Sequence, residues 1–334
     1  MLEKDLVIVG GGPAGMAAAI SAYENGVSDI LLLERDQYLG GILNQCVHTG
    51  FGISYFKEVL TGPEYSGRFI NKVKAIDKIE ISLKSFAVNL TKDKILTFIK
   101  PGLIQKLKAK ALIMATGARE RTREMLHIPG ARPAGIFSAG LAQKLINIEG
   151  LLPGKEVVIA GSGDIGLIMA RRFVLEGAKV KAVIEIQKQA RGLVRNVVQC
   201  VEDFEIPFYL QHKISRIYGK NRVERIDVAR VDENFQEIAG TKFQLECDTL
   251  LISVGLIPEN ELIEMAQAKM DKKTNTPVSN ELNKTSIAGL FVCGNAFRIY
   301  DLVDSVTKDS VLAGRQAAEY LIRGSGRTIP AGLK

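Results

Sequence analysis

Two stretches of the chain repeat the same pattern of apolar and polar positions. Each begins with a short apolar run rich in β-branched residues, continues through a glycine turn into a helix, and ends with a second apolar run followed by Glu. Continuous apolar runs of this length are typical of strands buried in a parallel sheet. The pattern therefore predicts two β-α-β units in one chain. Their segments are 5–9, 13–25 and 30–33 in the first copy, and 157–160, 165–176 and 180–184 in the second.

Both copies carry the glycine spacing G-x-G-x-x-G, and the two copies begin 151 residues apart. The first glycine allows a tight turn, the second lets the backbone approach a pyrophosphate, and the third lets helix and strand pack closely. The Glu that follows can accept hydrogen bonds from a ribose. We predict two dinucleotide sites; the alternative is two accidental glycine turns. The residues are Gly10, Gly12, Gly15 and Glu34, and Gly161, Gly163, Gly166 and Glu185.

Further segments indicate how the chain is divided into domains. Short alternating stretches over 78–108 and 214–246 are typical of antiparallel meanders. A last strand and helix, over 289–321, have no core of their own and must pack on one of the two units. We predict an α/β fold of two Rossmann-like three-layer dinucleotide-binding domains, each with a small antiparallel meander and the second inserted in the first. The predicted domains are 1–118 with 287–334, and 119–286.

The composition is that of a globular protein. The chain has 334 residues, 46% of them hydrophobic, and a mean hydropathy of +0.09. No apolar run approaches the ~20 residues that a membrane-spanning helix needs. The first strand begins within a few residues of Met1, which leaves no room for a signal peptide. We therefore expect a cytoplasmic protein without a membrane span.

The net charge of +7 is concentrated between Lys72 and Lys110, where ten lysines accompany three acidic residues. These lysines alternate with apolar residues, as on an exposed strand, and no interleaved aromatic set or nucleic-acid-binding motif accompanies them. We therefore expect no nucleic-acid partner. Two interpretations stay open: a solvated hairpin face, or a docking face for an acidic protein.

The cysteines and histidines do not form a local site in the sequence. The four cysteines lie far apart without a C-x-x-C pair, and the three histidines show no H-E-x-x-H spacing. We therefore expect neither a local dithiol nor a bound metal. The cysteines are Cys46, Cys200, Cys247 and Cys293.

The order of motifs along nearly the whole chain resembles that of one family. The motifs are GGGPAG over 10–15, ATGARER over 115–121, GSGDIG over 161–166, ISVG over 252–255 and LFVCGNA over 290–296. The order resembles the pyridine nucleotide–disulfide oxidoreductases in their short, thioredoxin-reductase-like form. The resemblance implies an oxidoreductase with FAD in the discontinuous outer domain and NAD(H) in the inserted domain.

The resemblance also implies which residues bind the cofactors. Ala75 should lie near the adenine of FAD, and Asn295 stands where members usually carry Asp, although Asn can still hydrogen-bond a ribityl hydroxyl. The residues implied for FAD are Gly10, Gly12, Pro13, Ala14, Gly15, Glu34, Arg35, Gly41, Leu43, Ala75, Ala115, Thr116, Gly117, Gly294 and Asn295. Those implied for the nicotinamide nucleotide are Gly161, Gly163, Asp164, Ile165, Gly166, Glu185 and Gly255.

The chain departs from the family just before the second glycine turn. Short reductases carry their redox C-x-x-C there, whereas this chain reads Phe-Ser-Ala-Gly-Leu over 137–141. Dithiol chemistry of that kind is therefore absent. The segments 40–52 and 115–137 narrow the resemblance to flavoproteins that act with a second, substrate-oxidising flavin subunit, as in relatives of glycerol-3-phosphate, opine and proline dehydrogenase complexes.

We therefore expect an FAD-dependent NAD(P)H oxidoreductase that exchanges electrons with a partner protein or dehydrogenase subunit, in a homo- or hetero-oligomer. Glu185 would repel a 2′-phosphate, which favours NADH over NADPH, although Arg191 follows closely. Two alternatives stay open. One is a free-standing reductase of ferredoxin, quinone or oxygen, and the other is a non-catalytic nucleotide-binding subunit.

Hydride transfer depends on stacked rings at a fixed distance more than on a side-chain acid, so no catalytic triad is needed. Two side chains are nevertheless candidates for a catalytic role. Cys46 follows the loop expected near the flavin and precedes His48, which could stabilise a thiolate; the alternative is a small packing residue. Lys308 could reinforce positive potential near the flavin from a helix beginning at Ser305; the alternative is a surface lysine.

Overall fold

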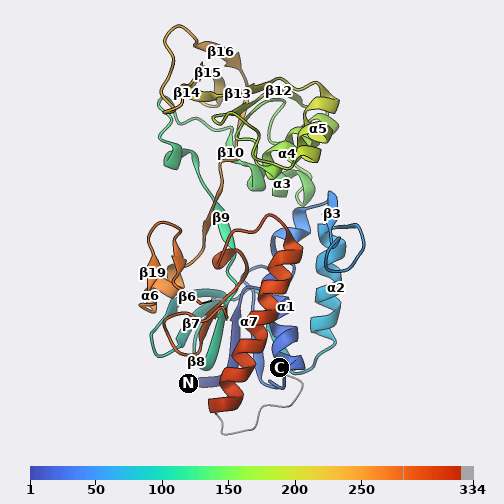
Figure 1. Ribbon diagram of the computed structural model, residues 1–334, viewed down its shortest axis with the longest axis vertical. Helices are drawn as coiled ribbons and strands as arrows, with labels where there is room; N and C mark the ends of the chain where they lie inside the picture. The colour runs from blue at the N-terminus through green and yellow to red at the C-terminus, as the bar shows by residue number, and fades with distance from the viewer. Residues whose placement is uncertain (281, 325–334) are drawn as a thin grey trace. The chain divides into compact units, whose positions relative to one another are not determined.

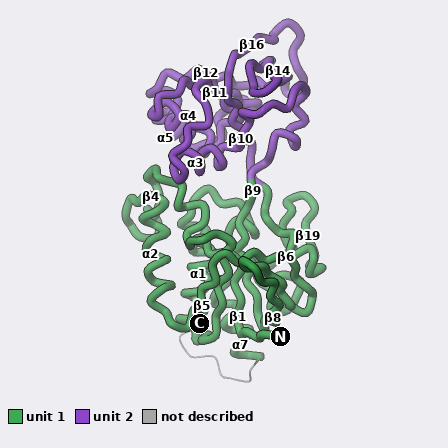
Figure 2. The backbone as a smooth tube through the Cα atoms, turned by 180° about the vertical axis from the view of Figure 1, so that it is seen from behind, with its two compact units in different colours: residues 1–119, 257–334 green, residues 120–256 purple. Residues whose placement is uncertain are grey.

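The computed structural model of the chain describes residues 1–280 and 282–324. These form two compact units (Figure 2): unit 1 comprises residues 1–119 and the segment that begins at Ile257, and unit 2 comprises Glu120–Leu256. The chain leaves unit 1 in β9 (Ala118–Glu120) and returns in β18 (Leu256–Pro258). Unit 2 is therefore inserted in unit 1, and the predicted fold class is confirmed.

Unit 1 is built on one sheet with β1 at its centre. Parallel strands follow the order β5-β2-β1-β8, and β21 also pairs with β8 in parallel. The first half of β8 pairs antiparallel with β7, and β7 pairs antiparallel with β6, which gives a meander over 86–108. The predicted meander began at residue 78, but β5 pairs in parallel with β2 instead. The strands are β1 (Leu2–Val9), β2 (Ile30–Leu33), β5 (Ile79–Ser82), β6 (Phe86–Leu90), β7 (Ile95–Lys100), β8 (Leu103–Met114) and β21 (Leu290–Val292), with a small pair of β3 (Thr49–Phe51) and β4 (Leu60–Thr61).

Three helices cover one face of this sheet, and α1 and α7 lie side by side on it (Figure 1). The two helices can approach closely because Gly314 of α7 has no side chain, and a Cβ there would overlap the carbonyl oxygen of Ala18 on α1. The C-terminal helix therefore docks on unit 1. The elements are α1 (Pro13–Glu24), α2 (Gly62–Lys74), α7 (Val303–Gly324) and the single turns η1 (Gly41–Gln45) and η4 (Gly294–Ala296).

The structure places the second domain boundary at Ile257 rather than at residue 287. The reason is helix α6 (Glu261–Met265), whose fully buried Ile263 lies in the same core as Leu90 and Leu96 of the meander. A short hairpin of β19 (Met270–Asp271) and β20 (Thr276–Pro277) follows. The segment 257–280 is therefore the outer cover of the meander in unit 1. The last ten residues of the predicted range 287–334 lie outside the described residues.

Unit 2 repeats the architecture on a smaller scale. Its five-stranded parallel sheet has the order β10-β17-β11-β12-β13, and a three-stranded antiparallel meander packs its apolar side chains against one face. The helices pack on the other face. The elements are β10 (Ile136–Ser138), α3 (Ala139–Asn147), β11 (Glu156–Ala160), α4 (Asp164–Leu175), β12 (Lys179–Glu185), α5 (Val194–Cys200), β13 (Phe208–Leu210), β14 (His212–Gly219), β15 (Val223–Arg230), β16 (Phe243–Glu246), β17 (Thr249–Ile252), η2 (Arg123–Leu126) and η3 (Glu202–Phe204).

Candidate functional site

The first glycine turn joins β1 to α1 at the carboxyl edge of the sheet in unit 1. Gly10 has a φ of +112°, and a Cβ there would overlap the carbonyl oxygen of Ala115. A Cβ on Gly15 would overlap the carbonyl oxygen of Gly10, so this glycine brings the helix against the strand. Gly12 is different: the nearest atom to its Cβ position is the Gly41 Cα, 3.9 Å away. The first and third glycines are therefore needed by the fold, whereas the second leaves open space.

The second glycine turn, between β11 and α4 in unit 2, has the same geometry. A Cβ on Gly161, whose φ is +97°, would overlap the carbonyl oxygen of Ser253, and one on Gly166 would come 2.8 Å from the Ser253 Cβ. The Cβ position of Gly163 has no neighbour closer than the Ser253 Oγ, at 3.8 Å. Of the three glycines in each copy, only the second borders a space that the pyrophosphate of a dinucleotide could fill. This is the position at which a pyrophosphate approaches.

The helices that follow these turns present their first N–H groups without a side-chain cap. Gly12 and Gly163 occupy the N-cap positions of α1 and α4, and neither helix has a side-chain hydrogen bond at its cap. Uncapped N–H groups and the positive end of the helix dipole favour phosphate. The residues present therefore fit two dinucleotide pyrophosphates, one in each unit.

The two predicted ribose-binding carboxylates are held in matching ways. Glu34 accepts hydrogen bonds from the backbone N–H groups of Gly11 at 2.7 Å and Asp36 at 2.8 Å. Glu185 accepts from Ser162 N at 2.9 Å and Gln187 N at 2.8 Å. Both side chains are buried, so each carboxylate is fixed beside its glycine turn. A fixed carboxylate can accept ribose hydroxyls without first losing conformational freedom.

Unit 2 adds a side chain that the sequence motifs did not single out. The Ser162 Oγ donates to the Glu185 Oε2 at 2.6 Å and accepts from the Arg191 N–H at 3.0 Å, and Ser162 is fully buried. Gly11 occupies the equivalent position in unit 1 and can offer only its backbone. The sequence could have indicated this role, because the residue after the first glycine is Gly11 in one copy and Ser162 in the other.

The loop after β12 is fastened to the second glycine turn. Gly192 N donates to the carbonyl oxygen of Ser162 at 2.8 Å, and the Asp164 Oδ1 accepts from Leu193 N and Asn196 Nδ2, both at 2.7 Å. Unit 1 has a similar closure, in which Gly40 N donates to the carbonyl oxygen of Gly11 at 2.9 Å. Each nucleotide loop is thus tied to its glycine turn by backbone bonds. Asp164 lies in the first turn of α4 but is committed to this loop.

Most of the other predicted residues of unit 1 gather at the first glycine turn. A Cβ on Gly41 would lie 3.0 Å from the Gly12 Cα, and one on Gly294 would lie 2.7 Å from the Ala14 Cβ. Ala115 N donates to the carbonyl oxygen of Val9 at 2.9 Å, at the end of β1. The remaining members are Pro13 as the first residue of α1, buried Leu43 in η1, Thr116 with its Oγ1 2.6 Å from the carbonyl oxygen of Glu259, Gly117 at φ +75°, and Asn295 in η4. In unit 2, Ile165 lies in the first turn of α4 and Gly255 has a φ of +105°.

One predicted residue, Ala75, does not join this group. Ala75 ends α2 and precedes β5, whose first residue Ile79 pairs with Ile30 at the start of β2. Ala75 therefore lies at the opposite strand ends from Glu34, because α2 runs antiparallel to the strands. The segment that does reach Glu34 is Ser82–Ser85, since Ser85 N donates to the Glu34 carbonyl at 2.8 Å. Arg35 directly follows Glu34, with an exposed side chain.

The geometry around Cys46 favours packing over thiolate chemistry. Its Sγ lies 3.3 Å from the Ile42 carbonyl oxygen, to which the thiol donates. Burial raises the pKa of the Cys46 thiol to about 12. A Cβ on Gly62 would come 2.8 Å from the Cys46 Cβ, so the residue is closely packed against the start of α2. The neutral thiol is therefore the form present at physiological pH.

The start of α7 contacts the loop after β3. The carboxylate of buried Asp304, in the first turn of α7, accepts from Gly52 N at 3.1 Å and Ser54 N at 2.7 Å. Lys308 is exposed, with its Nζ 3.5 Å from the Ser54 Oγ. Asp304 thus holds the loop after β3 by hydrogen bonds, whereas Lys308 lies beside that loop at the surface.

A carboxylate does reach the Gly294–Asn295 segment from α7. The Asp309 Oδ2 accepts from Gly294 N at 2.8 Å, and its Oδ1 accepts from Asn283 Nδ2 at 2.8 Å. Burial raises the pKa of the Asp309 carboxyl. Asn295 itself accepts from Tyr300 N at 3.1 Å. A buried acidic side chain of α7 therefore lies beside this segment, although the motif itself has Asn at position 295.

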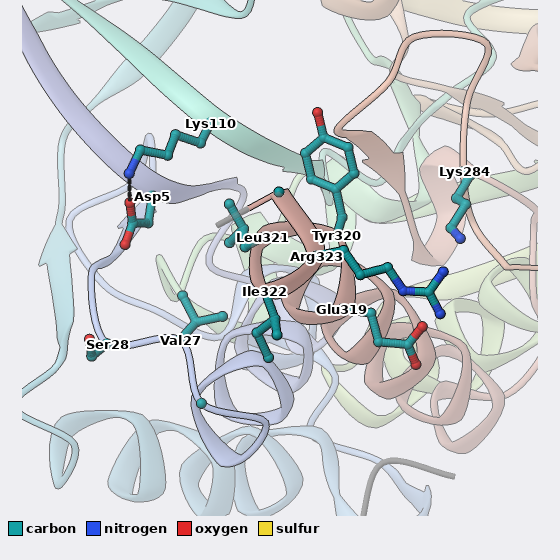
Figure 3. A pocket seen from close by; sticks show the side chains of 12 residues that line it. Asp5, Val27, Ser28, Lys110, Lys284, Glu319, Tyr320, Leu321, Ile322 and Arg323 are labelled. Atoms are coloured by element: carbon teal, nitrogen blue, oxygen red, sulfur yellow. Dashed lines mark ion pairs between the residues drawn. The ribbon is translucent and has the colours of Figure 1, made fainter. Parts of the chain in front are cut away.

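Three further observations concern a metal site, a membrane span and a cavity. Within residues 1–280 and 282–324, no group of three His, Cys, Asp or Glu side chains is placed to hold a metal ion. In the same residues, no helix has both the length and the apolar character that a bilayer span requires. A cavity of about 740 Å³ in unit 1 (Figure 3) lies between the start of β1 and the end of α7, with Asp5, Lys110 and Tyr320 in its lining. It is at the amino ends of the strands, whereas nucleotides bind at their carboxyl ends.

Two dinucleotide turns, each in its own α/β unit and with one unit inserted in the other, define the class of two-dinucleotide oxidoreductases. The family model described as pyridine nucleotide-disulphide oxidoreductase matches residues 4–310, and the chain belongs to this family. The chain is accordingly an FAD-dependent pyridine nucleotide oxidoreductase whose cofactors are FAD and NAD(P)H.

Individual relatives are distant. An opine oxidase subunit of Agrobacterium tumefaciens is 25% identical over 99% of this chain, which spans only 66% of that protein's length. A 34.2 kDa protein in the rubredoxin operon of Clostridium pasteurianum is 24% identical over 96% of this chain and 97% of its own. Among solved structures, the thioredoxin reductase of T. acidophilum matches 96% of this chain and 99% of its own, with a TM-score of 0.76 and 20% identity. The structural likeness supports the fold.

Proposed function

We propose that the chain is an FAD-dependent NADH oxidoreductase whose electrons pass to or from a partner protein or dehydrogenase subunit. The observation that carries the proposal is the pair of open second glycines, Gly12 and Gly163, each beside a buried, fixed carboxylate. When bound, the cofactors supply the redox chemistry, in which a hydride passes between nicotinamide and flavin. The protein contributes binding and orientation through backbone N–H groups and the two carboxylates.

We assign FAD to the turn in unit 1 and NADH to the turn in unit 2. The assignment to unit 1 is supported by the convergence of Gly41 and Gly294 on the first turn, because these are residues that the family resemblance implies for FAD. The preference for NADH is supported by Glu185, whose charge opposes a 2′-phosphate and whose position is fixed by Ser162. The exposed Arg191 next to this carboxylate is the group that would favour NADPH.

A protein partner is supported by the lack of the family's usual internal electron acceptor. None of the four cysteines, all of which lie in the described part of the chain, forms a disulfide, and none belongs to a C-x-x-C pair. Two relatives are named as subunits, one of an opine oxidase and one of a hydrogen cyanide synthase. The chain spans 66% and 57% of the lengths of these two relatives. Their names therefore support an organisation in subunits but do not indicate the substrate of this chain.

Anaerobic stopped-flow with the FAD-loaded protein tests the proposal. We expect NADH to bleach the flavin at ~10 s⁻¹ or faster, NADPH to do so much more weakly, and the reduced flavin to react slowly with oxygen. Slow bleaching by both nucleotides would contradict the assignment and favour a non-catalytic nucleotide-binding subunit. Fast oxygen or ferredoxin turnover without any partner would favour the free-standing reductase, which is the second candidate.

A further inference from the structure

The meander of unit 1 has two faces with different surroundings. One face is core: Leu90, Leu96 and Leu107 are Cα neighbours across β6, β7 and β8, and they pack against Ile263 of α6. The other face is formed by the alternate residues of the same strands. β6 is the last strand in the sheet order, so β6, β7 and β8 form one end of the sheet of unit 1 (Figure 1). Outward positions of such a hairpin are normally polar.

An apolar row crosses this outward face. Phe86, Ile99 and Ile104 are paired in register across β6, β7 and β8, and they are 52%, 42% and 68% exposed. We call these three residues the meander ladder. Single exposed apolar residues need no explanation, but a contiguous exposed row marks an interaction surface. Cross-strand neighbours of this kind present one continuous surface, because side chains directly opposite each other on neighbouring strands are close enough to touch.

Basic side chains border the meander ladder. On β8, Lys106 and Lys108 follow Ile104 at alternate positions and are exposed. Among residues 1–280 and 282–324, no ion pair or hydrogen bond engages either ammonium group, although Glu3 is the Cα partner of Lys108 on β1. By contrast, Lys110 is bound to Asp5 at 2.7 Å. Residues 81–108 contain six lysines and a single acidic residue, Asp93.

We propose that the meander ladder is a docking surface for an acidic protein partner, with Lys106 and Lys108 paired to carboxylates of that partner. An apolar centre with a charged rim is the arrangement of a protein–protein interface. The two lysines would draw an acidic surface toward the ladder and set its orientation. The proposal rests on the proposed function for the existence of a partner, and it adds the surface used and the charge of that partner.

A protein suits this surface better than an anionic membrane. The ladder is a row within a flat sheet, whereas membrane-surface segments are typically amphipathic helices that bury a whole apolar face. Outside the row, the same face carries Thr97 and Asn89, which would have to enter the headgroup region with it. Membrane binding is therefore an outcome that would overturn the proposal.

The experiment uses the full-length tagged protein isolated from its host together with whatever subunits remain bound. Carbodiimide coupling joins an amine to a carboxylate only where the two are in contact, and coupled peptides are identified by mass spectrometry. We expect couplings from Lys106 or Lys108 to Asp or Glu of a co-isolated protein. Each co-isolated protein is then purified and its Kd for the chain is measured at two salt concentrations.

Three variants give the comparison. Ile104→Ser should weaken binding by about 10-fold or more, in the range of a buried interface residue. The pair Lys106→Glu and Lys108→Glu should weaken it by ~100-fold at low salt and much less at high salt, because surface charges are screened. The matched control pair, Lys179→Glu and Lys220→Glu, changes exposed lysines of unit 2 and should leave the Kd within about twofold.

Four results would overturn the proposal: no co-isolated protein, couplings that avoid Lys106 and Lys108, ladder variants that bind as tightly as the control pair, or ladder-dependent binding to vesicles of 30% phosphatidylserine in phosphatidylcholine. Flavin reduction by NADH is measured on the same preparations. If NADH reduces the flavin but the Ile104 variant and the Lys106/Lys108 variant bind the partner normally, only the docking surface is refuted. If the flavin is not reduced, the proposed function fails independently of the binding result.

Discussion

Replacing Gly12 by Ala separates the needs of the fold from those of the nucleotide. The backbone φ of Gly12 is −76°, which any residue can adopt, and the nearest atom to a new Cβ would be 3.9 Å away. Ala is a poorer N-cap than Gly, so we expect Gly12→Ala to reduce the free energy of unfolding by about 1 kcal/mol. That is a small part of the 5–15 kcal/mol typical of a domain.

The same methyl group should strongly weaken FAD binding. It would project into the only open space at the first turn, where the backbone N–H groups must approach the pyrophosphate. A hydrogen bond to a charged group contributes about 1.5–3 kcal/mol, so losing two of them raises Kd by at least ~100-fold. Gly12→Ala should therefore be folded but nearly free of FAD.

Two further variants provide controls for Gly12→Ala within the same protein. Gly163→Ala changes the equivalent open position of unit 2 and should retain FAD while losing rapid reduction by NADH. Gly10→Ala places its Cβ on the Ala115 carbonyl oxygen at a φ of +112°, so it should lower Tm sharply. FAD content is read from flavin absorbance, stability from thermal unfolding, and NADH binding from anaerobic reduction. The reasoning is refuted if Gly12→Ala retains full FAD, and the assignment is reversed if Gly163→Ala is the variant that loses it.

Three other changes test individual contacts. Ser162→Ala removes one donor to Glu185 and the anchor of Arg191 N, so Kd for NADH should rise about 5- to 10-fold with little effect on NADPH; equal effects on both would contradict a role in nucleotide choice. Cys46→Ser should leave NADH-dependent turnover unchanged, and alkylation of Cys46 at pH 8 should be on the order of 1000-fold slower than that of free cysteine, because its thiol pKa is about 12. Asp309 has a raised carboxyl pKa in the folded state, so the folded protein binds more protons than the unfolded chain above pH ~3.9 and loses stability as pH rises. Asp309→Asn should flatten that decline in urea unfolding measured from pH 4 to 7; an unchanged slope would contradict the role given to burial.

The glycine turns could be predicted because their physical requirements are local. A φ above +90° at Gly10 and Gly161 and close helix packing at Gly15 and Gly166 follow from the turn itself. The apolar runs before and after each turn then fix two parallel strands and the place of each carboxylate. These features need only neighbouring residues, so sequence spacing describes them well.

The parts that the sequence did not predict depend on contacts between distant segments. Helix α6 has five residues, too few for a clear apolar period, and it belongs to unit 1 only because Ile263 is buried against the meander. The family resemblance implies that Ala75 lies near the adenine, but the direction of α2 carries it to the other end of the strands. The 12-residue β8 extends beyond the predicted meander, because on one side it pairs antiparallel with β7 over Leu103–Lys108 and then in parallel with β21 over Leu112–Met114.

The two nucleotide turns share a backbone device and differ in one side chain. In each, a glycine N–H in the following loop donates to the carbonyl of the second fingerprint residue, from Gly40 to Gly11 and from Gly192 to Ser162. This closure uses backbone atoms alone, but the room for a side chain at this residue differs between the units. In unit 1 a Cβ on Gly11 would come 2.5 Å from the Leu39 side chain, whereas in unit 2 the position holds Ser162. Ser162 ties Glu185 to the loop that carries Arg191, the two residues with opposite effects on a 2′-phosphate. Selection between NADH and NADPH should therefore depend on this third residue as well as on the Glu and Arg themselves.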